Sequence, residues 1–135
     1  MGLATRIWRQ AMGEILIIDD DAGMRRTIVR ILESAGYTAL EAENGRIGLD
    51  KFLAQHPRLV ITDLLMPAKD GLETIRDIRK SGLSTKILAT SGGWRTAQLD
   101  FLGAAAEFGA DMVLPKPFRS KDLLDAVGKL LEAAG

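Results

Sequence analysis

The chain has 135 residues, of which 47% are hydrophobic and 27% charged, so it fits one ordinary domain that can build a core. Its 18 basic and 18 acidic residues give a formal net charge of zero, which disfavours direct binding to nucleic acid. The absence of cysteine excludes disulfides, thiolate metal sites and cysteine nucleophiles.

The N-terminal region contains no recognisable sorting signal. Its longest purely aliphatic run, at residues 15–18, is too short for a membrane span or a signal-peptide core. We therefore expect a cytoplasmic protein without membrane insertion. Residues 1–13 are expected to form a flexible N-terminal extension, and residues 14–135 to form the domain.

Short apolar runs then alternate with helical patterns. A continuous apolar strand is expected over residues 14–18, typical of a strand covered on both faces. Apolar residues at helical spacing follow from Met24 to Ala35, and Gly36 ends that helix. Asp21 is expected to cap this helix. A second strand is predicted over residues 37–42.

The middle of the chain repeats this pattern. Asn44 is a candidate cap for a second helix, which should stop before His56 and Pro57 because the residue preceding proline avoids helical angles. A third strand is predicted over residues 59–62. A loop with Pro67 leads into a helix that ends near Gly82, and a fourth strand covers residues 86–90.

The last part of the chain completes five strand and helix pairs. An alanine-rich helix is expected after Gly92 and Gly93 and runs to about Phe108, followed by a strand over residues 112–114. A final helix carries an apolar stripe from Leu123 to Leu131. The pattern predicts a (βα)5, doubly wound α/β fold with a parallel five-stranded sheet, whose ligands bind at the carboxyl ends of the strands.

Polar residues follow the predicted strands at this edge. The first strand is followed by Asp19, Asp20 and Asp21, the third by Asp63, the fourth ends near Ser91, and Lys116 follows the fifth. Several carboxylates in a small volume repel one another and need a cation to offset the repulsion. Oxygen ligands without His or Cys favour Mg²⁺. A metal, a lysine, a hydroxyl and a carboxylate nucleophile suit phosphoryl transfer.

Four separated motifs carry a resemblance to a known family. The runs ILIIDDDAGMRR, LVITDLLMPAKDGLE, ILATSGG and VLPKPF occur in this order. Together they resemble the receiver domain of two-component response regulators, from about Glu14 to the C-terminus. The resemblance implies the flavodoxin-like strand order 2-1-3-4-5. It also suggests a receiver of the stand-alone type, without an output domain of its own.

The resemblance implies a role for each site residue. Asp63 would be the phosphoacceptor, Asp20 would bind Mg²⁺ directly and Asp19 mainly through water. The backbone carbonyl of Leu65 would complete the protein ligands, and Lys116 would hold a phosphoryl oxygen. The Lys116–Pro117 bond is expected to be cis, as is usual in this family.

Ser91 would be the switch hydroxyl that moves to the phosphoryl group. Thr90 is the competing choice, but Ser91 fits better because a small residue, Gly92, follows it. Val113 stands where many receivers have an aromatic partner for this hydroxyl, so a ring flip is not expected. The loop around Trp94 either contacts a partner or is a solvated loop.

The expected function is that of a phosphoacceptor and not of an enzyme. The phosphoryl group would come from a histidine kinase or a histidine phosphotransfer protein. The signal would pass to a downstream protein by docking, with a phosphorylation-dependent homodimer as one form of association. The alternative is a Mg²⁺-dependent aspartate-nucleophile phosphatase of the haloacid dehalogenase type. Residues 19–21 contain its Asp-x-Asp spacing, but the chain is short for the usual cap and Asp63 would have no role. A degenerate receiver that is not phosphorylated is disfavoured because the site side chains are all present: Asp19, Asp20, Asp63, Ser91 and Lys116.

Overall fold

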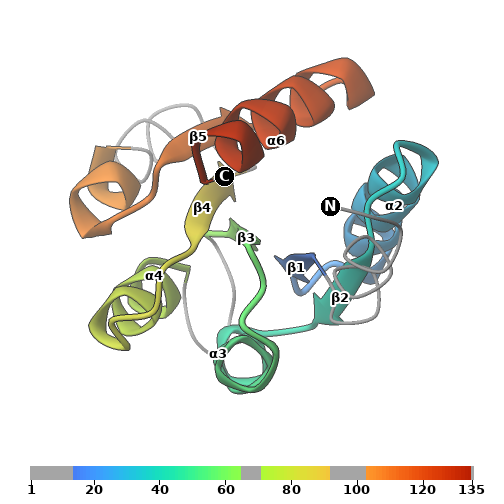
Figure 1. The fold of residues 1–135 in the computed structure, drawn as a ribbon. Helices are drawn as coiled ribbons and strands as arrows, with labels where there is room; N and C mark the ends of the chain where they lie inside the picture. Colours follow the sequence, from blue (N-terminus) through green and yellow to red (C-terminus); the bar gives the residue numbers. More distant parts are fainter. Residues whose placement is uncertain (1–13, 65–70, 92–102, 135) are drawn as a thin grey trace.

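The computed structural model describes residues 14–64, 71–91 and 103–134. It contains a five-stranded parallel sheet with the order β2-β1-β3-β4-β5. Figure 1 gives the labels of the elements. The strands are β1 (Ile15–Ile18), β2 (Ala39–Ala42), β3 (Leu59–Asp63), β4 (Lys86–Ser91) and β5 (Met112–Pro115). The predicted doubly wound α/β fold and the strand order implied by the resemblance are confirmed.

Helices cover both faces of the sheet. They are α2 (Ala22–Ser34), α3 (Gly45–Gln55), α4 (Gly71–Lys80) and α6 (Ser120–Ala134), and residues 103–108 are also helical. Helices α2 and α6 pack on one face, and α3 and α4 on the other (Figure 1). This arrangement explains the continuous apolar runs: in β1, Ile17 enters the core with α2 and α6, and Ile18 enters the core with α3 and α4.

Two side-chain caps fix where helices begin. The Asp21 side chain accepts a hydrogen bond from the Met24 amide at 3.1 Å at the start of α2. Asn44 does the same for the Ile47 amide at 2.8 Å at the start of α3. Both caps satisfy amides that have no partner within the helix, and both confirm the prediction.

Some strand boundaries differ from the prediction. Strand β2 begins at Ala39 instead of residue 37, because the Tyr37 amide donates to the Leu32 carbonyl at 3.1 Å and so belongs to the end of α2. Gly36 makes this turn possible with a φ of 91°. Strand β1 begins one residue later than predicted, and β3, β4 and β5 each end one residue later.

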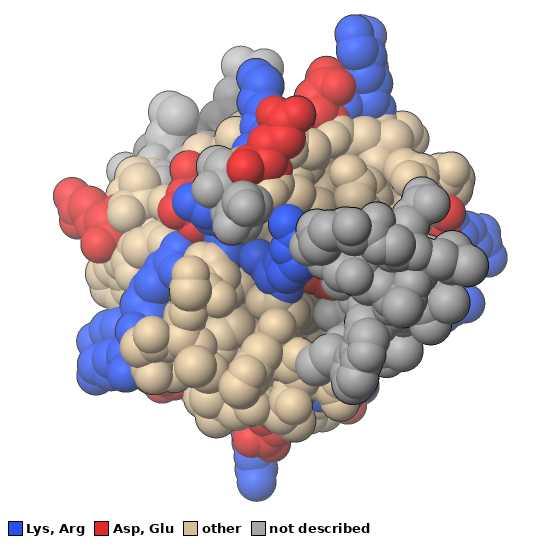
Figure 2. Space-filling model, viewed as in Figure 1, with Lys and Arg blue, Asp and Glu red and all other residues tan. Residues whose placement is uncertain are grey.

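Both signs of charge occur on the molecular surface. Figure 2 shows basic and acidic side chains on the same face of the molecule, in keeping with the zero net charge. Among the described helices, none is both long and apolar enough to cross a membrane.

Candidate functional site

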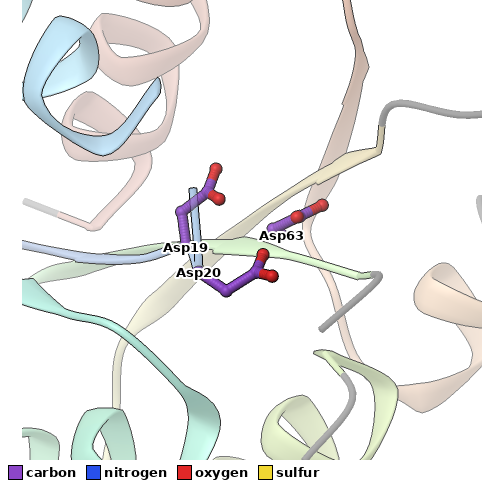
Figure 3. A group of neighbouring side chains, drawn as sticks. All are labelled: Asp19, Asp20 and Asp63. Carbon is purple, nitrogen blue, oxygen red and sulfur yellow. The ribbon is translucent and has the colours of Figure 1, made fainter. Parts of the chain in front are cut away.

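Three carboxylates meet at the carboxyl end of the sheet. Asp19 and Asp20 directly follow β1, and Asp63 is the last residue of β3. These strands are neighbours, with Ile18 paired to Thr62, so their ends lie side by side. One oxygen from each of the three carboxylates lies within 4.8 Å of the other two. Figure 3 shows the three side chains at these strand ends. The predicted convergence of Asp19, Asp20 and Asp63 is what the structure contains.

The three carboxylates differ in exposure. Asp19 and Asp63 are only 1% and 6% exposed, whereas Asp20 is exposed. Buried carboxylates in close proximity disfavour one another's charged form unless a cation compensates. The exposed side of the group, at Asp20, is open to solvent and therefore to an incoming ion.

Lys116 supplies one compensating charge from the end of β5. Its Nζ lies 3.0 Å from Asp19 Oδ2 and 3.7 Å from Asp63 Oδ2. Its backbone amide donates to the Ser91 carbonyl at 2.8 Å, which holds the chain beside the end of β4. The Lys116–Pro117 peptide bond is cis, as the resemblance implied. One lysine thus contacts two of the three carboxylates.

Asp19 is held in place from several directions. The Asp21 amide donates to Asp19 Oδ1 at 2.9 Å, so both carboxylate oxygens of Asp19 have partners. Arg25 donates from Nη1 to the Asp19 carbonyl at 2.7 Å. The side chain and the backbone of Asp19 are therefore fixed before any ligand binds.

Arg25 also belongs to a second ion-pair group beside the site. Its Nε lies 3.0 Å from Glu41 Oε1, and Arg26 Nη1 lies 2.8 Å from Glu41 Oε2. Burial raises the pKa of Glu41, but hydrogen bonds from Arg26 and Arg25 and their positive charges outweigh it, so the pKa is lowered. Arg25 and Glu41 line a hollow of about 220 Å³ together with Ala42, Glu43, Ile47 and Lys51.

The two hydroxyls at the end of β4 lie at successive positions. Thr90 is the register partner of Asp63, and Ser91 is one residue further along, paired with Pro115. Both are almost completely buried. Side chains alternate along a strand, so the two hydroxyls lie on opposite faces of the sheet. Ser91 remains the predicted switch hydroxyl, and Val113 packs in the core with α3 and α4.

Gly71, the first residue of α4, lies against the backbone of the site. A Cβ at this position would lie 2.2 Å from the Asp63 carbonyl oxygen and 2.6 Å from the Leu64 Cα. The first residue of α4 thus passes directly against the backbone that carries the predicted phosphoacceptor. A glycine at the start of a helix just after the Asp63 loop was the available signal, but it does not by itself show which backbone lies close.

Some predicted features lie outside the described residues. They are the carbonyl ligand Leu65, the extension 1–13, and the loop that contains Gly92, Gly93, Trp94 and Arg95. Of the residues near the site that are described, His56 is exposed, and Phe118 packs against the core that α6 helps to form.

Comparison with known proteins identifies the family of this arrangement. The model of the response regulator receiver domain matches residues 15–128. The response regulator MprA of Mycolicibacterium vanbaalenii is 36% identical over 117 residues, which cover 87% of this chain and 49% of that protein. The transcriptional regulatory protein CpxR of Escherichia coli (strain K12) is 32% identical over 120 residues, 89% of this chain and 50% of that protein. The chain thus spans about half the length of these curated relatives.

Solved structures show the same fold. A response regulator receiver domain protein from Clostridium thermocellum aligns with a TM-score of 0.82 and 29% identity, over 90% of this chain and 95% of that one. The Vibrio cholerae chemotaxis protein CheY4 aligns with a TM-score of 0.78 and 26% identity, over 88% of this chain and 98% of that one. None of these matches favours the haloacid dehalogenase alternative. The chain belongs to the receiver domains of response regulators.

Proposed function

We propose that Asp63 accepts a phosphoryl group from a phosphohistidine of a histidine kinase or a histidine phosphotransfer protein. The observation that carries this proposal is the group of three carboxylates within 4.8 Å, with Lys116 Nζ between Asp19 and Asp63. Asp63 is the carboxylate at the end of the central strand β3. The family match supports the assignment.

The proposed transfer forms an acyl phosphate. An oxygen of the Asp63 carboxylate attacks the phosphorus, the phosphorus–nitrogen bond of the phosphohistidine breaks, and the imidazole leaves with the bonding pair. This attack brings anionic oxygens together, so positioning and charge neutralisation supply most of the catalysis. Lys116, already near Asp63, would hold a phosphoryl oxygen.

The carboxylates also suit a divalent cation. Their donor set consists of oxygens alone, as Mg²⁺ prefers, and the exposed Asp20 leaves a path from solvent. Asp19, Asp20 and Asp63 would hold Mg²⁺, and the resemblance adds the carbonyl of Leu65. When bound, the ion would reduce the repulsion between the carboxylate and the phosphoryl oxygens.

The proposed signal is a change of shape around the phosphoryl group. Ser91 would move toward it and alter the surface near β5, where a downstream protein or a second copy of the chain would dock. Residues 14–135 would form the receiver domain and residues 1–13 an extension. The chain would act in the cytoplasm, where histidine kinases phosphorylate their partners.

Phosphate incorporation tests the proposal. With Mg²⁺ and a small phosphodonor such as acetyl phosphate, intact-mass spectrometry should show one added phosphoryl group on the parent protein and none on Asp63→Asn. Asp125→Asn is the matched control, because Asp125 is an exposed carboxylate on α6. Equal incorporation in Asp63→Asn and the parent would contradict the assignment. Deletion of residues 1–13 should leave incorporation unchanged.

A further inference from the structure

Thr90 has a buried hydroxyl that lacks a hydrogen-bond partner. The residue is 1% exposed, and its Oγ1 has no hydrogen-bond partner among the described residues. Its backbone carbonyl, in contrast, accepts a hydrogen bond from the Leu64 amide at 2.9 Å. Most buried polar groups in native proteins are hydrogen-bonded, because an unpaired one destabilises the folded state. The Thr90 hydroxyl therefore calls for an explanation.

The register places Thr90 on the same face of the sheet as Asp63. The two residues are direct Cα partners in the pairing of β3 and β4, and partners in a parallel pair project to the same side. Leu88, two residues before Thr90, packs in the core with α2 and α6. Leu114, the partner of Thr90 on β5, packs against the same core. Thr90 thus adjoins the site on the face of α2 and α6.

Lys116 must cross β4 on this face to reach its partners. It follows β5, whereas the carboxylates that it contacts belong to β3 and to the end of β1. Strand β4 lies between β3 and β5 in the sheet. At the row of Asp63, the residue of β4 is Thr90. Thr90 is therefore the β4 residue that lies in register with the path of the lysine side chain.

The ammonium group of Lys116 is placed unequally between its two carboxylates. Its Nζ is 3.0 Å from Asp19 Oδ2 but 3.7 Å from Asp63 Oδ2. A phosphoryl group on Asp63 would attract the Lys116 ammonium group away from Asp19. The N–H that now donates to Asp19 would then need another acceptor. An ammonium has three donors, and a threonine hydroxyl can accept one of them.

We propose that Thr90 is a positioning residue for Lys116, whose hydroxyl accepts a hydrogen bond from the ammonium group when Lys116 turns toward a phosphorylated Asp63. This inference rests on the proposed function. It differs from the role predicted for Ser91, which lies on the opposite face and would itself contact the phosphoryl group. At rest the Thr90 hydroxyl has no partner within the described part of the chain, and it gains one in the phosphorylated state.

Substitution by valine tests the proposal, because valine has nearly the shape of threonine without the hydroxyl. Without Mg²⁺, Thr90→Val should raise the melting temperature by about 3 to 6 °C, since an unpaired buried group is removed. Thr85→Val is the matched control: Thr85 is also buried, but its hydroxyl donates to the Pro57 carbonyl at 3.0 Å. Thr85→Val removes this hydrogen bond and should therefore lower the melting temperature.

The second measurement is the affinity for beryllium fluoride with Mg²⁺, followed by amide chemical shifts. The adduct on Asp63 stands in for the phosphoryl group. Thr90→Val should weaken this affinity on the order of fivefold, which corresponds to one lost hydrogen bond. Thr90→Ser retains the hydroxyl and should bind within about twofold of the parent, whereas Thr90→Ala should bind as weakly as valine.

The outcomes separate this inference from the proposed function. If the parent protein does not bind beryllium fluoride, the proposed function is contradicted, and this inference with it. If the parent binds and Thr90→Val binds equally well, the positioning role alone is wrong. A melting temperature that falls in Thr90→Val as it does in Thr85→Val would show that the hydroxyl is already paired at rest, which also overturns the inference.

Discussion

The two ends of the parallel sheet are built from similar residues but are organised in opposite ways. At the amino end, Arg79 of α4 donates to the Gly109 carbonyl at 2.9 and 2.8 Å and to the Thr85 carbonyl at 2.7 Å. It also pairs with Asp111 Oδ2 at 2.7 Å. That carboxylate accepts the Ile87 amide at 2.8 Å. One guanidinium thus joins α4 to the beginnings of β4 and β5.

A second arginine closes the same end between β1 and β3. Arg58, just before β3, forms an ion pair of 2.7 Å with Glu14, just before β1. It also donates to the Leu131 carbonyl of α6 at 3.3 Å. Each of these two arginines at the amino end therefore has a carboxylate of its own and further carbonyl acceptors.

Among the described residues, the carboxyl end gathers three carboxylates, of which Lys116 contacts two. Asp20 belongs to the same group at an exposed position, and the buried Thr90 hydroxyl has no hydrogen-bond partner among the described residues. Such an arrangement destabilises the resting fold locally. The sheet is thus stabilised at the end where no chemistry is expected. Repulsion between carboxylates remains at the other end, where a bound cation would reduce it.

The largest expected effect follows from removing the arginine at the amino end. Arg79→Met should lower the free energy of unfolding by about 3 kcal/mol, because it removes the guanidinium donors of two carbonyls and the cation that pairs with Asp111. Urea denaturation measures this effect. Arg76→Met is the control, since Arg76 is an exposed arginine on the same helix. An equal and small loss in both variants would contradict the assigned role, and phosphate incorporation by the folded variant should be unchanged.

The second-largest loss of stability is expected from a substitution of Gly109, at the same end of the sheet. It has a φ of 122°, and an added Cβ would lie 2.8 Å from Arg79 Cγ. Gly109→Ala should therefore destabilise the protein by about 2 kcal/mol through backbone strain and displacement of the arginine. Gly103→Ala is the control, because nothing lies within 4 Å of a Cβ there. Thermal unfolding should show no loss for Gly103→Ala; a similar loss in both would remove the special role of Gly109.

A change at the carboxyl end should have the opposite sign. Asp20→Asn should raise the free energy of unfolding by about 0.5 kcal/mol in the presence of a chelator, because it relieves repulsion at an exposed position. It should also remove most of the rise in melting temperature that Mg²⁺ gives the parent. The exposed Asp125→Asn should leave both quantities as in the parent. A full Mg²⁺ response in Asp20→Asn would place the metal elsewhere.

The fold was predictable because β1, β3 and β4 are apolar on both faces and alternate with amphipathic helices. This pattern leaves the order of the strands open, and the order was predicted from the family resemblance. Strand β2 was predicted too long, because Tyr37 suits a strand by composition while its amide is used to end α2. Whether an amide joins a strand or a helix end depends on the fold around it.

The candidate site was predictable as a set of carboxylates because the carboxyl ends of parallel strands share one edge. Two features were not predictable: the close approach of Gly71 to the Asp63 backbone, and the reach of Lys116 across β4 to Asp63. Both depend on how separate elements meet in space. The role of Arg79 could not be predicted for the same reason. In the sequence it is one of several charged residues in the segment that forms α4.

A similarly small effect is expected at Glu41, an acidic group near the carboxyl end that pairs with two arginines. Burial raises the pKa of Glu41, but hydrogen bonds from Arg26 and Arg25 and their positive charges outweigh this, so the pKa lies below its ordinary value of 4.5. A carboxyl group whose pKa is lower in the folded state stabilises the protein above the ordinary pKa. This contribution is lost as the pH falls through the folded value.

Glu41→Gln should therefore lower stability by about 0.5 kcal/mol at neutral pH, as for a surface ion pair, and less at high salt. Part of the acid sensitivity of the parent between about pH 5 and pH 3 should disappear in the variant. Urea denaturation across this range measures both effects. Glu43→Gln is the control, because Glu43 is exposed on the same hollow and forms no ion pair within the described part of the chain. A pH dependence unchanged from the parent in Glu41→Gln would mean that Glu41 is not stabilised by its arginines, and that the excess of acid at this end extends beyond the three aspartates.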